Sequence, residues 1–290
     1  MTAVGEVQCV RRVTYVGMAV NIVIALLKGV GGVAFSSQAL FADAVHSLSD
    51  LVTDIAVVWG VRYWTAPADE EHPYGHGKIE ALVTLFIALA LVVVALGLGR
   101  QAVGSLIRGE ATVPGVAAFF FALVSVVSKD ALFRWTRRVA RVVHSPALEA
   151  NAWHHRSDAL SSIPVAIAVA VAYFWPSLAW IDAVGAILVS FFILGVAWSI
   201  AKPALQELVD ARMDDKAASV AAVASQVPGV IHVHRVRARR YGGAFAADLH
   251  VHVDPRLSVV EGHEIGHAVQ DALKSSDLDV TDAVVHVEPA

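Results

Sequence analysis

Long apolar stretches alternate with short polar connections through the first 208 residues of the chain. A helix needs about 20 predominantly apolar residues to cross the hydrocarbon core of a bilayer. Six stretches reach that length: residues 13–35, 38–64, 79–106, 113–135, 150–175 and 179–203. The pattern therefore predicts a membrane α-helical protein, with six transmembrane helices in residues 1–208 and a separate cytosolic domain in residues 209–290.

The last 82 residues show shorter periods. Apolar and polar positions alternate in three segments, which is the pattern of β-strands that are buried on one side. The predicted order is a helix over 214–226, strands over 231–240 and 246–254, a helix over 259–274 and a strand over 280–288. An α+β domain this small buries little core, so association with a second copy would stabilise it.

Composition and charge support the membrane assignment and orient it. The chain is 57% hydrophobic and 17% charged, with a mean hydropathy of +0.61, whereas a soluble domain has about 25% charged residues. Basic residues gather in the second-to-third and fourth-to-fifth connections; Lys129, Arg134 and Arg141 are assigned to the latter. The positive-inside rule then places both termini in the cytoplasm. The net charge of −4 gives no indication of a nucleic-acid partner.

Two apolar stretches each carry a histidine and an aspartate four residues apart: His46 with Asp50, and His154 with Asp158. Residues at i and i+4 share one face of a helix, so each helix would present an imidazole and a carboxylate in the same direction. Four such ligands complete a tetrahedral site for zinc or a similar ion. His155 lies about 100° around the helix from His154, and we assign His154 to the site. The alternative is that both pairs join helices as buried polar contacts.

A second group of candidate ligands surrounds the segment EHPYGHGK, which follows the second stretch. Proline and two glycines in so short a segment predict a turn. A turn can bring Asp69, His72 and His76 onto one metal ion. The alternative is a solvated acidic loop that binds no metal.

Histidines are concentrated in the last domain, which holds seven of the thirteen in the chain. The predicted strands and helix place them in pairs on common faces. These pairs are His232 with His234, His250 with His252, His286 with Glu288, and His263 with His267. If the faces meet, up to two metal ions would bind there; otherwise the histidines line a solvated sheet. A ligating histidine must be neutral, so occupancy would fall below the reference histidine pKa of about 6.5.

Three other functional classes match parts of this pattern. Residues 263–267 fit H-E-x-x-H, in which two helical histidines bind zinc and Glu264 activates water, but the helix is short for a protease site. A histidine-box oxidase would need more histidines at one membrane face than the connections contain. The third class is a membrane metal sensor or partner subunit that does not itself transport.

The segments EHPYGHGK and HHRSDALSS, with six predicted spans and a histidine-bearing tail, resemble the cation diffusion facilitator family. The resemblance covers nearly the whole chain. It implies a metal transporter rather than an enzyme: a homodimer that exports a divalent cation in exchange for protons by alternating access. It also implies that the tail has a ferredoxin-like, metallochaperone-like fold and contributes to regulation and dimerisation.

The resemblance also implies which residues bind metal. The transport ligands would be His46, Asp50, His154 and Asp158; the loop ligands Asp69, His72 and His76; and the tail ligands His232, His250, His263, His286 and Glu288. His234, His252 and His267 are left unassigned. Lys78 would form a charge interlock with Asp210 at the hinge between membrane and tail, across the dimer.

Histidine at the first transport position is similar to the zinc-preferring members of the family, so Zn²⁺ is the expected substrate and regulatory ligand. Two histidines and two aspartates also accept Fe²⁺, Co²⁺ or Cd²⁺, because selectivity depends on geometry and metal availability more than on affinity. Fe²⁺ transport, for example into an organelle, is the leading alternative. The fourth connection lacks the histidine-rich insert of many vesicular relatives, which favours a bacterial inner membrane over an organelle membrane.

Overall fold

The computed structural model describes residues 3–110, 112–142, 146–242 and 244–290, except for the side chains of residues 3–11, 50, 53, 54, 56–59, 61 and 146–150. Contacts divide the chain into two units. One comprises Met1–Val58 and Ile87–Trp198, and the other comprises Trp59–Phe86 and Ser199–Ala290. The second unit therefore joins the tail to the loop after the second helix and to the adjoining helix ends, which the sequence boundary near residue 208 did not anticipate.

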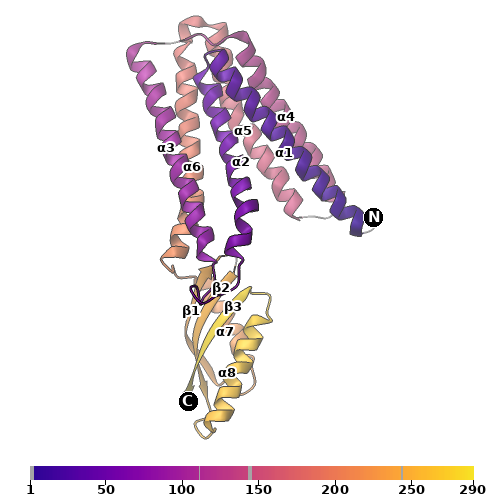
Figure 1. Cartoon of the computed structure of the whole chain (residues 1–290), viewed down its shortest axis with the longest axis vertical. Helices are drawn as coiled ribbons and strands as arrows, with labels where there is room; N and C mark the ends of the chain where they lie inside the picture. The colour runs from indigo at the N-terminus through magenta and orange to yellow at the C-terminus, as the bar shows by residue number, and fades with distance from the viewer. Residues whose placement is uncertain (1–2, 111, 143–145, 243) are drawn as a thin grey trace. The chain divides into compact units, whose positions relative to one another are not determined.

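Six long helices form the membrane part of the chain (Figure 1). They are α1 (Ala3–Ala34), α2 (Gln38–Trp64), α3 (Lys78–Arg108), α4 (Val116–Val142), α5 (Pro146–Phe174) and α6 (Trp180–Leu208). A single 3₁₀ turn, η1 (Pro176–Leu178), precedes α6. Among the described residues, five helices are long and apolar enough to span a membrane. The remaining one, α2, carries three aspartates, which make it less apolar than the others, but its 27 residues are enough to cross a bilayer. The predicted six-helix membrane fold is confirmed.

The N-terminus of α2 is capped by a carboxylate from α6. Asp182 accepts a hydrogen bond from the Ser37 hydroxyl at 2.7 Å and another from the backbone N–H of Gln38 at 2.6 Å. The first N–H groups of a helix have no partner within the helix, and an acidic group there also interacts favourably with the helix dipole. Asp182 is 2% exposed, so this cap ties two helices together inside the bundle.

Helix α4 packs along both α1 and α5. It extends to Val142, beyond the apolar stretch that ended at residue 135 in the sequence analysis. The extension packs on α1: Val13 and Ala140 are each 2% exposed and form a buried cluster with Trp135 and Val139. The helix therefore continues beyond residue 135 because it still makes apolar contacts with α1.

The tail is a three-stranded sheet with two helices. Its elements are α7 (Asp214–Ala224), β1 (His232–Tyr241), β2 (Ala244–Val253), α8 (Val259–Lys274) and β3 (Val280–Pro289). The strand order is β1-β2-β3, with β1 antiparallel and β3 parallel to the central β2 (Figure 1). This is the predicted order of helices and strands, and it confirms the α+β, ferredoxin-like tail.

Strand alternation separates a core face from a histidine face in this sheet. Leu249 and Val251 of β2 belong to one buried cluster with Val269 and Leu273 of α8. Because successive side chains point to opposite sides of a strand, the positions between them face away from the helices. The same pattern that builds the core therefore leaves a row of β2 side chains, including His250, on the open face.

The tail core can be tested with a matched pair of valines. Val251 is fully buried, whereas Val284 is 59% exposed. We expect Val251→Ala to lower the free energy of unfolding of purified residues 209–290 by about 2 kcal/mol, because it removes two buried methyl groups and leaves a cavity. Val284→Ala should change it by less than about 0.5 kcal/mol. Urea unfolding followed by circular dichroism measures both; equal effects would contradict this assignment of the core.

Candidate metal centres

The described part of the predicted transport site lies inside the membrane helices. His46 and Asp158 are 7% and 6% exposed. His154 Nε2 is 3.8 Å from Asp158 Oδ2, as the i,i+4 spacing predicts, and its side chain is 51% exposed. The side chain of Asp50 lies outside the described residues. The four-ligand site thus stays a prediction, with two of its members now known to be buried.

Of the adjacent histidines His154 and His155, the buried one is His155, which the sequence analysis did not assign to the site. It is 3% exposed, and its Nε2 faces Gly17 of α1. Among the described residues, neither ring nitrogen of His155 nor Nδ1 of His46 has a hydrogen-bond partner. Buried polar atoms nearly always have a partner, and one without it requires an explanation such as an ion or a water molecule. Both histidines are therefore candidates to supply a ligand atom.

A chain of buried charged and hydroxyl side chains leads to Asp158. Lys28 Nζ of α1 lies 3.0 Å from Asp43 Oδ2 and 2.5 Å from Ser47 Oγ, both of α2. Lys129 Nζ of α4 lies 3.3 Å from the same Ser47 oxygen and 3.5 Å from Asp158 Oδ2. The network thus connects four helices, and it ends on a predicted metal ligand.

Sequence reasoning missed this network and placed Lys129 in the cytoplasmic connection. The structure corrects that position: Lys129 is 1% exposed within α4, and Lys28 is fully buried within α1. Basic residues near the end of an apolar stretch are usually assigned to the loop. The signal for Lys28 is its isolation among apolar residues, since ionisable groups at membrane depth are rare and usually functional. Lys129 lacks that signal, because Ser128 and Asp130 flank it.

The loop group is assembled around Asp69. Its Oδ1 lies 3.2 Å from His72 Nδ1, and its Oδ2 lies 3.4 Å from His76 Nε2. The backbone N–H of His72 donates to Asp69 and holds the pKa of that carboxyl below its usual range. His76 Nδ1 contacts the carbonyl oxygen of Pro67 at 3.2 Å, which directs Nε2 to the carboxylate. The turn thus brings the three predicted ligands within reach of one ion.

The loop is attached to the tail sheet. The backbone N–H of Gly77 donates to the Tyr241 hydroxyl at 3.1 Å, and a Cβ at Gly77 would lie 2.7 Å from the Tyr241 ring. Lys78 Nζ lies 3.2 Å from Asp210 Oδ1 within a single chain. The predicted interlock residues therefore meet without a second copy of the chain.

The register of the tail sheet aligns its histidines in two rows across the strands. One row is His234, His250 and His286; the other is His232, His252 and Glu288. Each member lies opposite its neighbour in the ladder, where side chains on one face are within contact distance. The sheet thus presents six potential ligands on the face opposite the one that α7 and α8 cover.

Glu288 is the centre of this grid. Its Oε1 lies 2.8 Å from His250 Nδ1 and 3.4 Å from His286 Nε2. Its Oε2 lies 3.3 Å from His234 Nε2 and 3.4 Å from His252 Nε2. The hydrogen bond with His250 holds the pKa of Glu288 below its usual range, and desolvation lowers the pKa of His234. A carboxylate with two imidazoles at each oxygen has the ligands to bind one or two metal ions.

The observed tail group differs from the expected ligand set. His234, left unassigned from the sequence, joins His250 and Glu288 as the compact group of possible ligands. His263 does not lie with them in the same chain, because α8 packs on the other face of the sheet, where Gly266 approaches Val287. His263 instead contacts His267, with their Nε2 atoms 3.0 Å apart.

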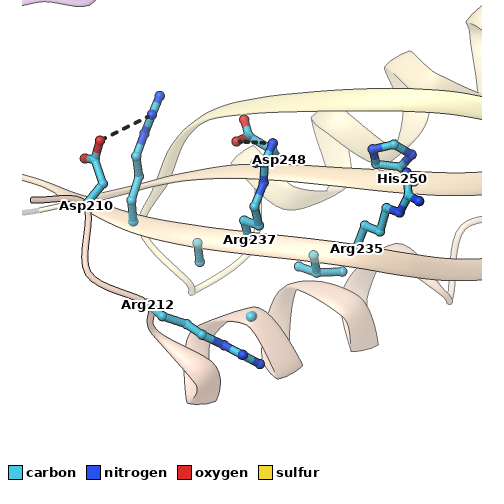
Figure 2. A pocket seen from close by; sticks show the side chains of 10 residues that line it. Asp210, Arg212, Arg235, Arg237, Asp248 and His250 are labelled. Carbon is cyan, nitrogen blue, oxygen red and sulfur yellow. Dashed lines mark ion pairs between the residues drawn. The ribbon is translucent and has the colours of Figure 1, made fainter.

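A pocket in the same unit is basic. Its charged lining residues, shown in Figure 2, are Asp210, Arg212, Arg235, Arg237, Arg239, Asp248 and His250. Asp248 lies 3.4 Å from Arg237, and Asp210 lies 3.9 Å from Arg239. Four arginines outnumber two aspartates, so the pocket repels a divalent cation. The histidine grid, and not this pocket, is the candidate metal centre of the tail.

Comparison with known proteins identifies similar chains over the full length. Residues 14–209 match the model of the cation efflux transmembrane domain, and residues 213–290 match that of the cation efflux protein cytoplasmic domain. An uncharacterized transporter of Methanocaldococcus jannaschii is 36% identical, covering 92% of this chain and 94% of its own. The manganese efflux system protein MneP of Bacillus subtilis is 29% identical over 97% of each chain. The magnetosome protein MamM of Paramagnetospirillum magneticum is 33% identical, covering 91% of this chain and 84% of its own.

The position of Glu288 predicts how the tail binds metal. Glu288→Gln should weaken Zn²⁺ binding to purified residues 209–290 by roughly 10- to 100-fold, because it removes the carboxylate that four histidines share. Glu264→Gln, an exposed substitution of the same kind on α8, should leave the affinity unchanged. Isothermal titration calorimetry at pH 7 measures both affinities. Equal losses in the two variants would contradict a site centred on Glu288.

The pH dependence of the same binding should follow the histidines. Glu288 stays ionised because its pKa is lowered, so acidification removes binding by protonating imidazoles, whose reference pKa is about 6.5. The affinity for Zn²⁺ should therefore be full above pH 7 and fall steeply between about pH 6.5 and 5. Because the pKa of His234 is also lowered, its protonation should come last in that range. Calorimetry across this range tests the order, and a loss only below about pH 4.5 would implicate the carboxylate instead.

Proposed function

Because the chain belongs to the cation diffusion facilitator family of cation efflux transporters, we propose that it exports a divalent metal cation, foremost Zn²⁺, in exchange for protons. The observation that carries this proposal is a buried carboxylate, Asp158, beside a histidine inside the membrane helices. A carboxylate and an imidazole are ligands that Zn²⁺ accepts in a tetrahedral site. His46 would add a second imidazole, and Asp50 a second carboxylate.

Proton exchange follows from the chemistry of these ligands. Histidine and aspartate must lose their protons to bind a metal, so metal binding from the cytoplasm releases protons. On the outward side, protonation of the same groups weakens them as ligands and releases the ion. In alternating access the transporter has an inward-open and an outward-open state. The metal and the protons each shift the balance between these states by the difference in their affinity for the two. One set of side chains thus couples the two fluxes.

The tail is proposed to regulate transport by binding metal. In this proposal a metal ion replaces the protons that lie between Glu288 and the four histidines around it. Each of the two Glu288 carboxylate oxygens could then bind one metal ion. The grid occupies the face of the sheet opposite α7 and α8, where a second copy of a small domain would gain the most from docking. If the metal affinity of two associated tails differs from that of separated tails, metal binding shifts the balance between these two states. That shift would couple the tail to the transport cycle of a homodimer.

The distribution of basic residues supports a cytoplasmic position for both termini and the tail. We assign the protein to a bacterial inner membrane, with an organelle membrane as the alternative. The relatives named above come from bacteria and from an archaeon, whose cells have such a plasma membrane. The name of the magnetosome protein MamM fits the organelle alternative.

Mn²⁺ is the second candidate substrate. The manganese efflux system protein MneP matches this chain over nearly its whole length, and Asp43 provides a further carboxylate one turn before His46 in α2. Carboxylate oxygens suit Mn²⁺, whereas imidazoles suit Zn²⁺ and Fe²⁺. Fe²⁺ remains the alternative for the histidine-containing site, and a direct comparison of the three ions decides among them.

Metal flux into proteoliposomes under an imposed pH gradient tests the function. The wild-type chain should move Zn²⁺ faster than Mn²⁺ or Fe²⁺, and only with the gradient. Asp158→Asn should reduce the flux by roughly 100-fold or more, since the loss of even an indirect metal contact costs 10- to 100-fold. Asp277→Asn, on the exposed surface of the tail, is the matched control and should transport normally.

Two histidine variants identify the imidazole that acts with Asp158. His154→Gln should abolish gradient-driven flux, while His155→Gln should retain part of it; the reverse result would exchange their roles. A wild-type chain that moves none of the three ions would refute transport and favour a metal sensor. In that case Zn²⁺ binding to the tail grid would remain as the measurable activity.

A further inference from the structure

Two buried lysines accompany the transport site, and one of them is held firmly. Lys28 donates to the backbone oxygen of Asp43 at 3.1 Å, to its Oδ2 at 3.0 Å and to Ser47 Oγ at 2.5 Å. An ammonium group has three donors, so α2 satisfies Lys28 completely. This lysine joins α1 to α2.

The second lysine, Lys129 of α4, is held loosely. Its Nζ lies 3.3 Å from Ser47 Oγ and 3.5 Å from Asp158 Oδ2, beyond the range of about 2.7–3.2 Å that is typical of an N–H···O hydrogen bond. The residue is nevertheless 1% exposed. Within the described part of the membrane unit, the carboxylate nearest to its ammonium group is the predicted metal ligand Asp158. A cation in this position competes directly with the metal.

We propose that Lys129 is a tethered counter-cation of the transport site: its ammonium neutralises Asp158 when no metal is bound, and the arriving metal displaces it. The inference rests on the proposed transport function and adds a positioning and affinity-setting residue to it. One cation replaces another on Asp158, so the protons that metal binding releases come from the other ligands and not from Asp158, and no covalent bond changes. Ser47 can retain the displaced ammonium, because a hydroxyl oxygen has two acceptor lone pairs and Lys28 uses one of them.

The charge balance of the network gives this role its physical basis. Lys28 and Lys129 carry two positive charges, and Asp43 and Asp158 carry two negative charges, all buried. An unpaired carboxylate at membrane depth is strongly unfavourable. Lys129 therefore stabilises the empty transporter, and its repulsion of a nearby divalent cation weakens metal binding and favours release.

Two modes of transport distinguish this role from a structural one. Metal–metal exchange uses only the loaded transporter, which crosses in both directions. Net flux also requires the empty transporter to return. Removal of a counter-cation that stabilises the empty form should slow net flux and spare exchange, whereas loss of a lysine that only holds helices together should impair both.

The experiment uses the full chain in proteoliposomes, with Zn²⁺ as the probe, and compares Lys129→Gln with wild type. The Kd for Zn²⁺, measured in detergent, should fall by about tenfold or more, which is the smallest effect expected when one charge within 4–6 Å is removed. Net Zn²⁺ flux should fall by a similar factor, while exchange of isotopically labelled Zn²⁺ should stay within about twofold. Lys129→Arg, which keeps the charge, should restore net flux, and Lys202→Gln at an exposed position should behave as wild type.

Each outcome decides the proposal. Unchanged or weaker Zn²⁺ binding in Lys129→Gln, or a parallel loss of exchange and net flux, would overturn it. If that variant does not fold, Lys129→Met takes its place; failure of both neutral variants beside a folded Lys129→Arg would assign a structural role and overturn the proposal. A wild-type chain without Zn²⁺ flux would refute the zinc transport function itself, which is a separate result.

Discussion

The neutralisation of charge inside the bilayer is the constraint on which the membrane unit depends. A proposed metal ligand such as Asp158 would have to be an ionised carboxylate to bind its ion, yet that group is unfavourable at membrane depth without a partner. The chain meets this constraint with lysines from two other helices, and Ser47 links their ammonium groups. The packing of α1, α2, α4 and α5 is consequently tied to the electrostatics of the site. In the proposed transport cycle, the arriving metal would replace the lysine as the cationic partner of this carboxylate.

The tail of the second unit presents many potential metal ligands on a small domain. A strand has two faces, and the tail uses one for its apolar core and the other for histidines. Central β2 carries both sets, with Leu249 and Val251 buried and His250 and His252 between them on the opposite face. Because β1 and β3 flank this strand in register, ligands from three strands reach Glu288. The helices cover only the core face, so the ligand face stays available to metal and to a second copy.

The loop after α2 belongs physically to the tail. Tyr241 accepts a hydrogen bond from Gly77, and Lys78 pairs with Asp210 immediately after α6. The group around Asp69 is therefore carried by the same unit as the Glu288 grid. Two candidate metal centres therefore lie in one unit of the chain.

The sequence by itself determined what depends on local periodicity. Apolar length predicted the six helices, alternation predicted the three strands, and the spacing of His154 and Asp158 placed them on one helix face, because these features repeat with the geometry of the element that contains them. The tertiary structure decided what depends on residues distant in the chain. The pairing of Lys129 with Asp158 joins α4 to α5, and the choice of His234 over His263 depends on which face of the sheet α8 covers. Neither follows from spacing along one element, because both are set by how separate elements pack.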